Sequence, residues 1–338
     1  MRLVDRVAQC RAPFIAVCNV TGARTPLSGA SDHALEVAAC ATRYVLNDEL
    51  TRLCAALAFS KGAQTLACTD LIRVPAESLW VEWAYAPWSD ELHKYGFPPG
   101  DLNESCGRRG ALLRASRDGR RGRIRTFWCL GNGEGEVFAS PLEAQFDLDA
   151  TESAGNAHLN GKSIRVTDDY IHNGSVMGTC FSFAFQETWA EYYDGARLSA
   201  QARQQVEHHL LGTIALDIPV LLAFLLMLNT RAGLPQHPSQ LDRLNRARCR
   251  SGKQALLDHI EVRAPFPCAQ GFSARDPDPS GRRRPRLHHV RGHIVRRRNE
   301  LFWRMPHLRG NSRAGVLKSR TVTWAFERKA SLLADSRE

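Results

Sequence analysis

The chain has 338 residues, of which 43% are hydrophobic and 24% are charged. This composition is typical of a globular protein with a sizeable core and excludes a disordered or fibrous chain. The formal net charge of +10 is unevenly spread, because residues 241–338 contain 23 Lys+Arg and 9 Asp+Glu, a net charge of +14, which leaves −4 for the rest. A basic final third indicates a polyanionic partner, or else a solvated basic surface without a specific partner.

The cysteines and the apolar runs indicate the compartment. Ten cysteines are scattered without a C-x-x-C pair, and most stand beside apolar residues, as small core side chains do. No apolar stretch near the N-terminus is long enough for a signal peptide. The apolar run 218–228 is shorter than the roughly 20 residues of a membrane span. The sequence therefore predicts a reduced, cytoplasmic protein without a membrane anchor.

The first part of the chain predicts helix and strand in alternation. Residues 13–23 are typical of a short strand that ends in a turn, and 31–60 show helical spacing behind Ser31 as a cap. The aromatic and branched stretch 78–85 predicts a strand, and its tryptophans favour a core position over a partner surface. Three further strands, joined by turns rich in Gly and Arg, are expected to form an antiparallel meander over 110–116, 123–130 and 136–148.

The middle of the chain predicts helices. Ser199 caps a helix over 199–214, and Asp217 with Pro219 marks the start of a second, buried one. A third helix is expected over 238–253, with Ser239 and Asp242 resembling a capping box. On it, an apolar stripe is expected to pack while three arginines share another face. The stripe is Leu241, Leu244 and Ala247, and the arginines are Arg243, Arg246 and Arg250.

The end of the chain predicts strands. A strand over 255–265 precedes a linker rich in Pro, Gly and Asp, and a hairpin follows in which 287–297 pairs with 301–305. Strand alternation places one set of polar side chains opposite Val290 and Ile294. That set is His289, Arg291, His293 and Arg297, and 315–326 offers a third strand.

Together these elements predict an α+β fold, with a mixed N-terminal α/β and antiparallel meander region, a helical middle and a basic β-rich C-terminal segment. The expected divisions are 1–148, 163–269 and 286–326.

The charge pattern predicts a phosphate-binding surface. Arginine forks pair with phosphates, and an aromatic ring stacks on an unpaired base. Trp303 or Phe302 would supply the ring. The arginines predicted to bind nucleic acid are Arg243, Arg246, Arg250, Arg291, Arg297 and Arg309.

The histidines of the basic segment leave two alternatives open. His289 and His293 would act as an acid–base pair on a phosphodiester, but four residues of strand separate them by roughly 13 Å, so a bulge at Gly292 or His307 as the second group is needed. Zinc held by these histidines and Cys268 matches no familiar spacing, and the arginines oppose a dication. We expect neither metal nor cofactor.

A second candidate site is acidic. Glu187 and Glu191 share a helix face near Asp194 and His172, which is compatible with a metal-dependent hydrolase but more typical of a solvated face. The sequence has no P-loop, no H-E-x-x-H and no G-x-S-x-G elbow.

Several stretches resemble a family of uncharacterised proteins encoded by phages and prophages of proteobacteria. They are spread over about residues 71–324 and comprise RVPAESLWVEW, FLLMLNTRAG, LDRLNRARCRSGKQALLDH and PRLHHVRGHIVRR…FWRMPHLRGNSRAGVLKSRTVTW. Gln254 and Ala255 stand where the family tends to have a proline-containing turn, and RRRNELFWRM lacks its glycine-containing turn. The resemblance implies a phage-related intracellular protein and no particular activity.

From these observations we predict a phage-related cytoplasmic accessory protein that binds DNA, RNA or another polyanion through its basic final third. The alternatives are a nuclease-like enzyme centred on His289, His293 or His307, and an inhibitor that binds a host defence protein.

Overall fold

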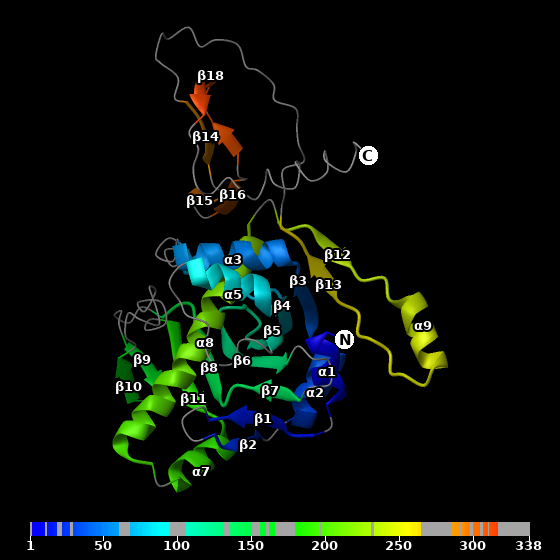
Figure 1. Ribbon diagram of the computed structural model, residues 1–338, viewed down its shortest axis with the longest axis vertical. Coiled ribbons are helices and arrows are strands. Elements are labelled where there is room, and N and C mark those ends of the chain that lie inside the picture. Colours follow the sequence, from blue (N-terminus) through cyan, green and yellow to red (C-terminus); the bar gives the residue numbers. More distant parts are fainter. Residues whose placement is uncertain are drawn as a thin grey trace, which may run out of the picture. The chain divides into compact units, whose positions relative to one another are not determined.

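The computed structural model (Figure 1) forms two compact units, residues 1–264 and 265–338. The first unit contains both the predicted N-terminal region and the helices of the predicted middle region, so no boundary between units lies between 148 and 163. The structure describes residues 2–10, 12–18, 22–27, 30–60, 68–94, 106–130, 136–150, 156–159, 162–165, 180–196, 198–230, 233–264, 286–290, 293–297, 300–304, 307–309 and 311–316.

A mixed sheet forms the centre of the first unit, in the order β10-β9-β11-β8-β6-β5-β4-β3-β13-β12, with β1, β2 and β7 off this path. Strands β4, β5, β6 and β8 pair antiparallel, which confirms the predicted meander, whereas β3 pairs parallel with β4 and β13. The strands are β1 (Phe14–Val17), β2 (Arg24–Leu27), β3 (Thr42–Leu46), β4 (Ser78–Ala84), β5 (Cys106–Ala115), β6 (Arg121–Leu130), β7 (Val137–Ala139), β8 (Leu142–Asp147), β9 (Asn156–Leu159), β10 (Lys162–Arg165), β11 (Phe181–Phe185), β12 (Gln236–Pro238) and β13 (Ile260–Val262).

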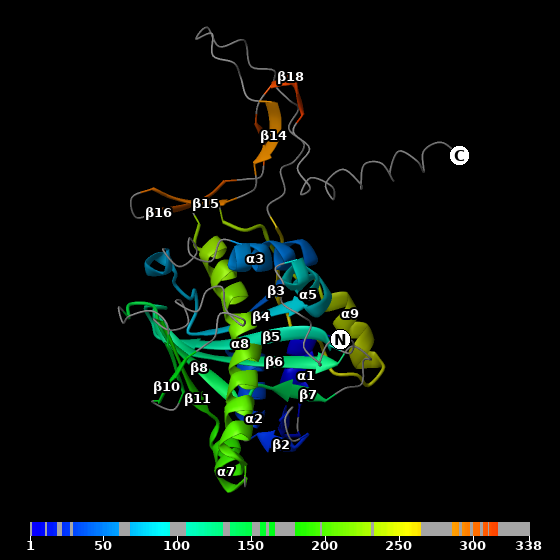
Figure 2. The ribbon, with the colours of Figure 1, turned by 60° about the vertical axis from the view of Figure 1, so that its left-hand side comes forward.

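Helices cover both faces of this sheet (Figure 2). Because the sheet is mixed and largely antiparallel, the fold is α+β. Alternation along β5 separates the faces, because Arg108 pairs with Glu82 beneath α1 while its neighbour Arg109 pairs with Asp217 of α8. The helices are α1 (Leu3–Gln9), α2 (Ala30–Ala39), α3 (Asp48–Ser60), the 3₁₀ turn η1 (Thr69–Leu71), α5 (Tyr85–Lys94), α7 (Glu187–Gly195), α8 (Ala200–Leu228) and α9 (Asp242–Arg250).

The single helix predicted over 31–60 is wrong, because strand β3 separates α2 from α3. Tyr44, Val45 and Leu46 are buried, and β3 lies between two parallel neighbours, β4 and β13. A strand buried on both faces is an apolar run without alternation, and periodicity alone does not distinguish such a run from a helix.

The two predicted helices of the middle region are one, α8, with Pro219 inside it. Ser199 caps it as predicted, since its hydroxyl accepts a hydrogen bond from the Ala202 amide at 3.1 Å. Asp217 is not an N-cap. By length and hydropathy α8 is long enough to cross a membrane, but 94% of its most apolar window is buried within the protein, so it is a core helix.

The structure also differs from the sequence prediction at two smaller points. The strand predicted over 136–148 is interrupted at Ser140 and Pro141, since proline has no N–H for a sheet ladder, and β7 and β8 are separate strands. The tryptophan-rich stretch is core, as predicted, because Trp80 and Trp83 have no exposed surface. Helix α5 begins at Tyr85, directly after the tryptophan-rich strand β4, and the sequence did not indicate this helix.

Within its described residues, the second unit has short strands in two small sheets. One has the order β17-β14-β18 and the other pairs β15 with β16. The predicted long strand over 287–297 is therefore two strands, although the hairpin of β15 and β16 has the expected antiparallel pairing. The strands are β14 (Arg286–Val290), β15 (His293–Arg297), β16 (Glu300–Arg304), β17 (His307–Arg309) and β18 (Asn311–Val316).

Candidate nucleic-acid interface

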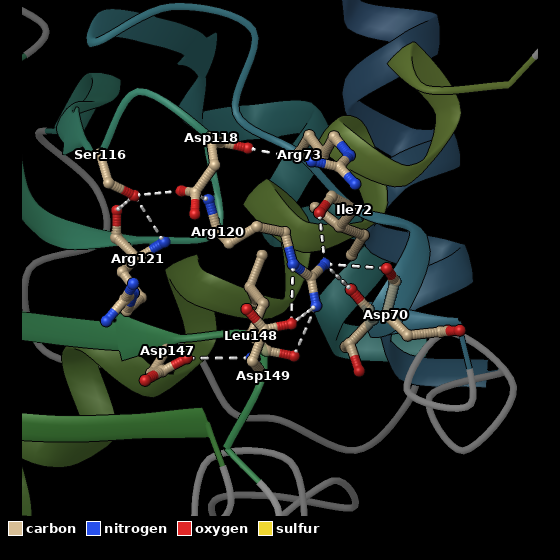
Figure 3. Close-up of polar contacts among 11 residues, drawn as sticks. Asp70, Ile72, Arg73, Ser116, Asp118, Arg120, Arg121, Asp147, Leu148 and Asp149 are labelled. Atoms are coloured by element: carbon tan, nitrogen blue, oxygen red, sulfur yellow. Dashed lines mark hydrogen bonds and ion pairs between the residues drawn. The ribbon is translucent and has the colours of Figure 1, made fainter.

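Some arginines of the first unit are buried and bound by other groups of the protein, whereas others are exposed to solvent. Arg120, at the turn between β5 and β6, belongs to the first group and is only 6% exposed (Figure 3). Its guanidinium donates to the Asp149 carboxylate at 2.5 Å and to four backbone carbonyls at 2.7–2.9 Å. These carbonyls belong to Thr69, Asp70, Ile72 and Leu148.

The turn that carries Arg120 fits tightly against the chain before β4. Gly119 has a φ of +70°, and a Cβ at this position would lie 2.4 Å from the Val74 carbonyl oxygen. Only glycine satisfies both the left-handed backbone and this close approach. Arg120 and Gly119 thus join the β5–β6 turn to η1, and this guanidinium is not available to a ligand.

Arg109 and Asp217 form a buried ion pair between β5 and α8. Two parallel hydrogen bonds of 2.8 and 2.6 Å join them, and their side chains are 4% and 0% exposed. The guanidinium lies over Trp88 and Trp128, at 5.0 and 5.7 Å from the ring centroids. Burial raises the pKa of the Asp217 carboxyl, while the Arg109 charge opposes this shift. The pair links α8 to the sheet.

Glu82 of β4 has a fully buried carboxylate that caps α1. It accepts hydrogen bonds from the backbone amides of Leu3 and Val4 at 3.0 and 2.8 Å, and Arg108 pairs with it. A carboxylate at a helix N-terminus satisfies amides that have no partner within the helix. Glu82 thus holds α1 to the sheet through the two amides, while its pair with Arg108 joins β4 to β5.

Arg125 of β6 is the third buried arginine on the sheet. It donates to Glu143 of β8 at 3.2 Å and lies 3.2 Å from the ring nitrogen of His33 in α2. Burial lowers the pKa of Arg125 to about 10. Like the other buried charges, it connects a helix to the sheet. Within the described residues, no group of three His, Cys, Asp or Glu side chains is placed to hold a metal ion.

The exposed arginines that the sequence predicted are on α9, at the end of an arm formed by residues 236–259. Extended segments leave and rejoin the sheet through β12 and β13, and α9 lies beyond them (Figure 1). The helix buries none of its residues. The predicted packing stripe is therefore wrong, since Leu244 is 48% exposed.

Backbone hydrogen bonds to Asn245 hold α9 to the returning segment of the arm. Its amide nitrogen donates to the Leu256 carbonyl at 2.9 Å, and its amide oxygen accepts from the Leu256 N–H at 2.8 Å. On the same side of the helix, Arg248 donates to the Gln254 carbonyl at 2.9 Å. Polar contacts thus replace the apolar packing that usually holds a short helix.

The C-terminal end of α9 is a Schellman motif. The Lys253 N–H bonds to the Arg248 carbonyl at 2.9 Å, and the Gly252 N–H bonds to the Cys249 carbonyl at 3.1 Å. Gly252 has the φ of +71° that this motif needs. The start of the helix differs from the prediction, because Leu241 is the N-cap. The Ser239 hydroxyl instead accepts from the His259 amide at 3.0 Å.

The base of the arm is attached to α1. The Asp5 carboxylate accepts a hydrogen bond from the Leu257 amide at 2.8 Å, and Gln9 donates to the Ala255 carbonyl at 3.4 Å. Burial raises the pKa of Asp5 and lowers that of His259. The arm is therefore a built part of the first unit.

Arg243, Arg246 and Arg250 form what we call the outer face of α9. At about 100° per residue they fall within an arc of roughly 60°, on the side away from Asn245 and Arg248. All three are exposed, and no other described residue forms a hydrogen bond or ion pair with their guanidinium groups. The prediction that they share one face is consistent with the position of the helix.

The C-terminal residues predicted to bind or react are described only in part. Arg291 and the side chains of His289, His293, His307 and Arg309 lie outside the described residues. Arg297 is exposed, whereas Trp303 is only 7% exposed, which argues against its ring as a stacking platform.

The backbone positions separate the candidate catalytic histidines. His289 is in β14 and pairs with Leu308, while His293 is in β15 and pairs with Arg304 of another sheet. The shared strand face that joined them in the sequence prediction is absent, because β14 and β15 are separate strands in these two sheets. His307 pairs with Val290 of β14.

The acidic candidate site does not assemble in the described part of the chain. Glu187 and Glu191 are exposed on α7, Asp194 has 80% of its side chain exposed, and His172 lies outside the described residues. Of the predicted zinc ligands, Cys268 also lies outside them. The eight cysteines whose side chains are described are free.

The fold and the arm define an α+β protein whose exposed, unpaired arginines project on a short helix. In comparisons with known proteins, no family model matches the sequence, and no curated protein or solved structure is significantly similar to it.

Sequence reasoning missed the residues that orient this helix. Asn245 and Arg248 stand among arginines and give no pattern of their own, whereas Ser251-Gly252-Lys253 is a recognisable C-terminal signal. It also missed the partner of Asp217. An aspartate within an apolar run indicates a buried charge that needs a cation, but nothing in the sequence identifies Arg109 as that cation.

Proposed function

We propose that the protein binds nucleic acid through the outer face of α9. The observation that carries this proposal is a helix that buries none of its residues and holds three exposed arginines on one side. A short helix with no apolar packing contributes little to a core, so its presence is better explained by a ligand. Phosphates suit arginine, whose planar fork binds two of their oxygens at once.

The charge of the arm supports a polyanion. Residues 236–259 contain five Lys+Arg and two Asp+Glu, a net charge of +3, in a unit whose first 240 residues carry −4. The cations are therefore concentrated on the arm and not spread over the surface. Arg291, Arg297 and Arg309 of the second unit belong to the same proposal as additional phosphate contacts.

The setting we propose is that of a phage-related accessory protein in the cytoplasm. The resemblance of the sequence to phage and prophage proteins supports the origin, and the free cysteines support a reducing compartment. An enzyme centred on the C-terminal histidines is a weaker proposal, since His289 and His293 lie on strands of different sheets.

Binding across a salt series tests the proposed function. The full chain is titrated into labelled DNA and RNA between about 50 and 300 mM salt, and the logarithm of affinity is expected to fall linearly with the logarithm of salt, with a slope of about −0.9 per phosphate contact. Affinity that does not change with salt, or no binding at about 50 mM, rejects the proposal. Parallel reactions with magnesium, run on a gel, reveal any cleavage and would favour the enzyme.

Asn245 is expected to act as a positioning residue. Asn245→Ala removes both bonds to Leu256, so α9 loses its fixed orientation and affinity for nucleic acid should fall about tenfold, while the melting temperature of the protein changes little because the arm is exposed. The salt slope should stay the same, since no phosphate contact is removed. Ser251→Ala, which removes one exposed bond within the same turn, is the control and should bind like the wild type. A smaller salt slope in Asn245→Ala would contradict a purely positioning role.

A further inference from the structure

We infer that the nucleic acid is double-stranded DNA and that α9 enters its major groove, with Arg243, Arg246 and Arg250 on the phosphates beside the groove. This inference rests on the proposed function and names its substrate class. It follows from the shape of the arm, the spacing of its arginines and the residue types that the arm lacks.

The shape of the arm fits a groove that admits a helix. An α-helix with its side chains is about 10–12 Å across, and the major groove of B-form DNA is about 12 Å wide. A-form RNA has a deep, narrow major groove that does not admit a helix. Because α9 lies beyond β12 and β13 and buries none of its residues, its outer face is open to such a groove.

The arginine spacing fits phosphates on a duplex. Arg243 and Arg250 are seven residues apart, which is about 10 Å along the helix axis, with Arg246 between them. This span equals about three steps of 3.4 Å along one DNA strand, so the three arginines can contact neighbouring phosphates on one wall of the groove. The opposite side of α9 is occupied by the Asn245 and Arg248 bonds, so only one face is presented.

The composition of the arm argues against single strands. Proteins that bind single-stranded nucleic acid stack its bases on aromatic side chains in a basic groove. Residues 236–259 are all described and contain no Phe, Trp or Tyr. The arm therefore offers cations and no stacking surface, which suits a stacked duplex read through its backbone.

Competition between probes of equal charge tests the inference. Fluorescence anisotropy compares a 20-base-pair DNA duplex with an RNA duplex of the same sequence, a single DNA strand of twice that length, and polyglutamate of matched charge, all at one salt concentration. We expect the DNA duplex to bind at least tenfold more tightly than the other probes. In Arg243→Gln/Arg246→Gln/Arg250→Gln this preference should disappear.

The outcomes separate the inference from the proposed function. Equal or tighter binding of single strands or of duplex RNA overturns the choice of double-stranded DNA and leaves nucleic-acid binding intact. Tighter binding of polyglutamate overturns both, and points to an acidic protein partner. No binding to any probe also overturns both. A duplex preference that persists in the triple variant places the DNA elsewhere on the protein and overturns the role of α9.

Discussion

Replacement of Arg243, Arg246 and Arg250 by glutamine is expected to weaken binding to DNA about a hundredfold near 0.1 M salt. Each phosphate contact releases about 0.9 of a condensed counterion, so the loss of three contacts should reduce the salt slope by nearly three. Glutamine keeps a long polar side chain and a similar helix propensity, so α9 should remain folded. Anisotropy titrations at several salt concentrations give both the affinity and the slope.

A second triple variant, Arg73→Gln/Arg117→Gln/Arg121→Gln, is the matched control. These three arginines are also exposed, and their replacement changes the net charge by the same amount at the β5–β6 turn and at Arg73, which donates to the Asp118 carbonyl of that turn. Because salt near 0.1 M screens charges beyond about 10 Å, the control should bind within about threefold of the wild type. Equal losses in the two variants would mean that total charge, and not α9, determines binding.

Replacement of Asp217 by alanine is expected to lower the free energy of unfolding by about 3–5 kcal/mol. The reason is that the Arg109 guanidinium, 4% exposed beside Trp88 and Trp128, would lose the Asp217 carboxylate and remain charged in the core. Urea unfolding followed by tryptophan fluorescence measures the change, since both rings lie against this arginine.

The double variant Arg109→Met/Asp217→Leu isolates the cause. It removes both charges and keeps apolar volume, and such replacements of buried ion pairs are often close to neutral. We therefore expect it to recover most of the stability that Asp217→Ala loses. Glu136→Gln breaks the ion pair with Arg24, in which both side chains are exposed, and serves as a surface control with a change of at most about 1 kcal/mol. A loss below about 1 kcal/mol in Asp217→Ala would show that the pair does not stabilise the core.

The two predictions concern separate parts of the molecule, so their results are independent. Arg243, Arg246 and Arg250 are exposed on the arm, while Arg109 and Asp217 are in the core between β5 and α8. Distant substitutions without shared partners usually act additively. Loss of binding in the arm variant with unchanged stability would thus assign the arm to ligand binding.

Local patterns in the sequence were enough for several elements. The meander of β5, β6 and β8 follows from alternating and aromatic runs between turns, and the Ser199 cap follows from a preference that acts within one turn of helix. The common face of Arg243, Arg246 and Arg250 needs only the helical period. Each of these depends on residues close together in the chain.

Other features depend on contacts between distant residues, which only the tertiary structure decides. Strand β3 is a strand because β4 and β13 pair with both of its edges, although its residues continue a helical pattern. Asp217 lies inside α8 and not at its start, because Arg109, 108 residues away, compensates its charge. His289 and His293 share a pattern in the sequence and lie in different sheets.

The arm combines features that local sequence patterns determine with features that depend on distant contacts. The sequence by itself determined that residues 242–250 form a helix with three arginines on one side, because periodicity and a glycine C-cap act locally. It did not determine that Leu244 is exposed, because the helix spacing of Leu241, Leu244 and Ala247 is equally compatible with packing. Only the tertiary structure decided that the helix stands on an arm, since bonds from Asn245 to Leu256 and from Asp5 to Leu257 hold it there, and those partners are 11 and 252 residues apart.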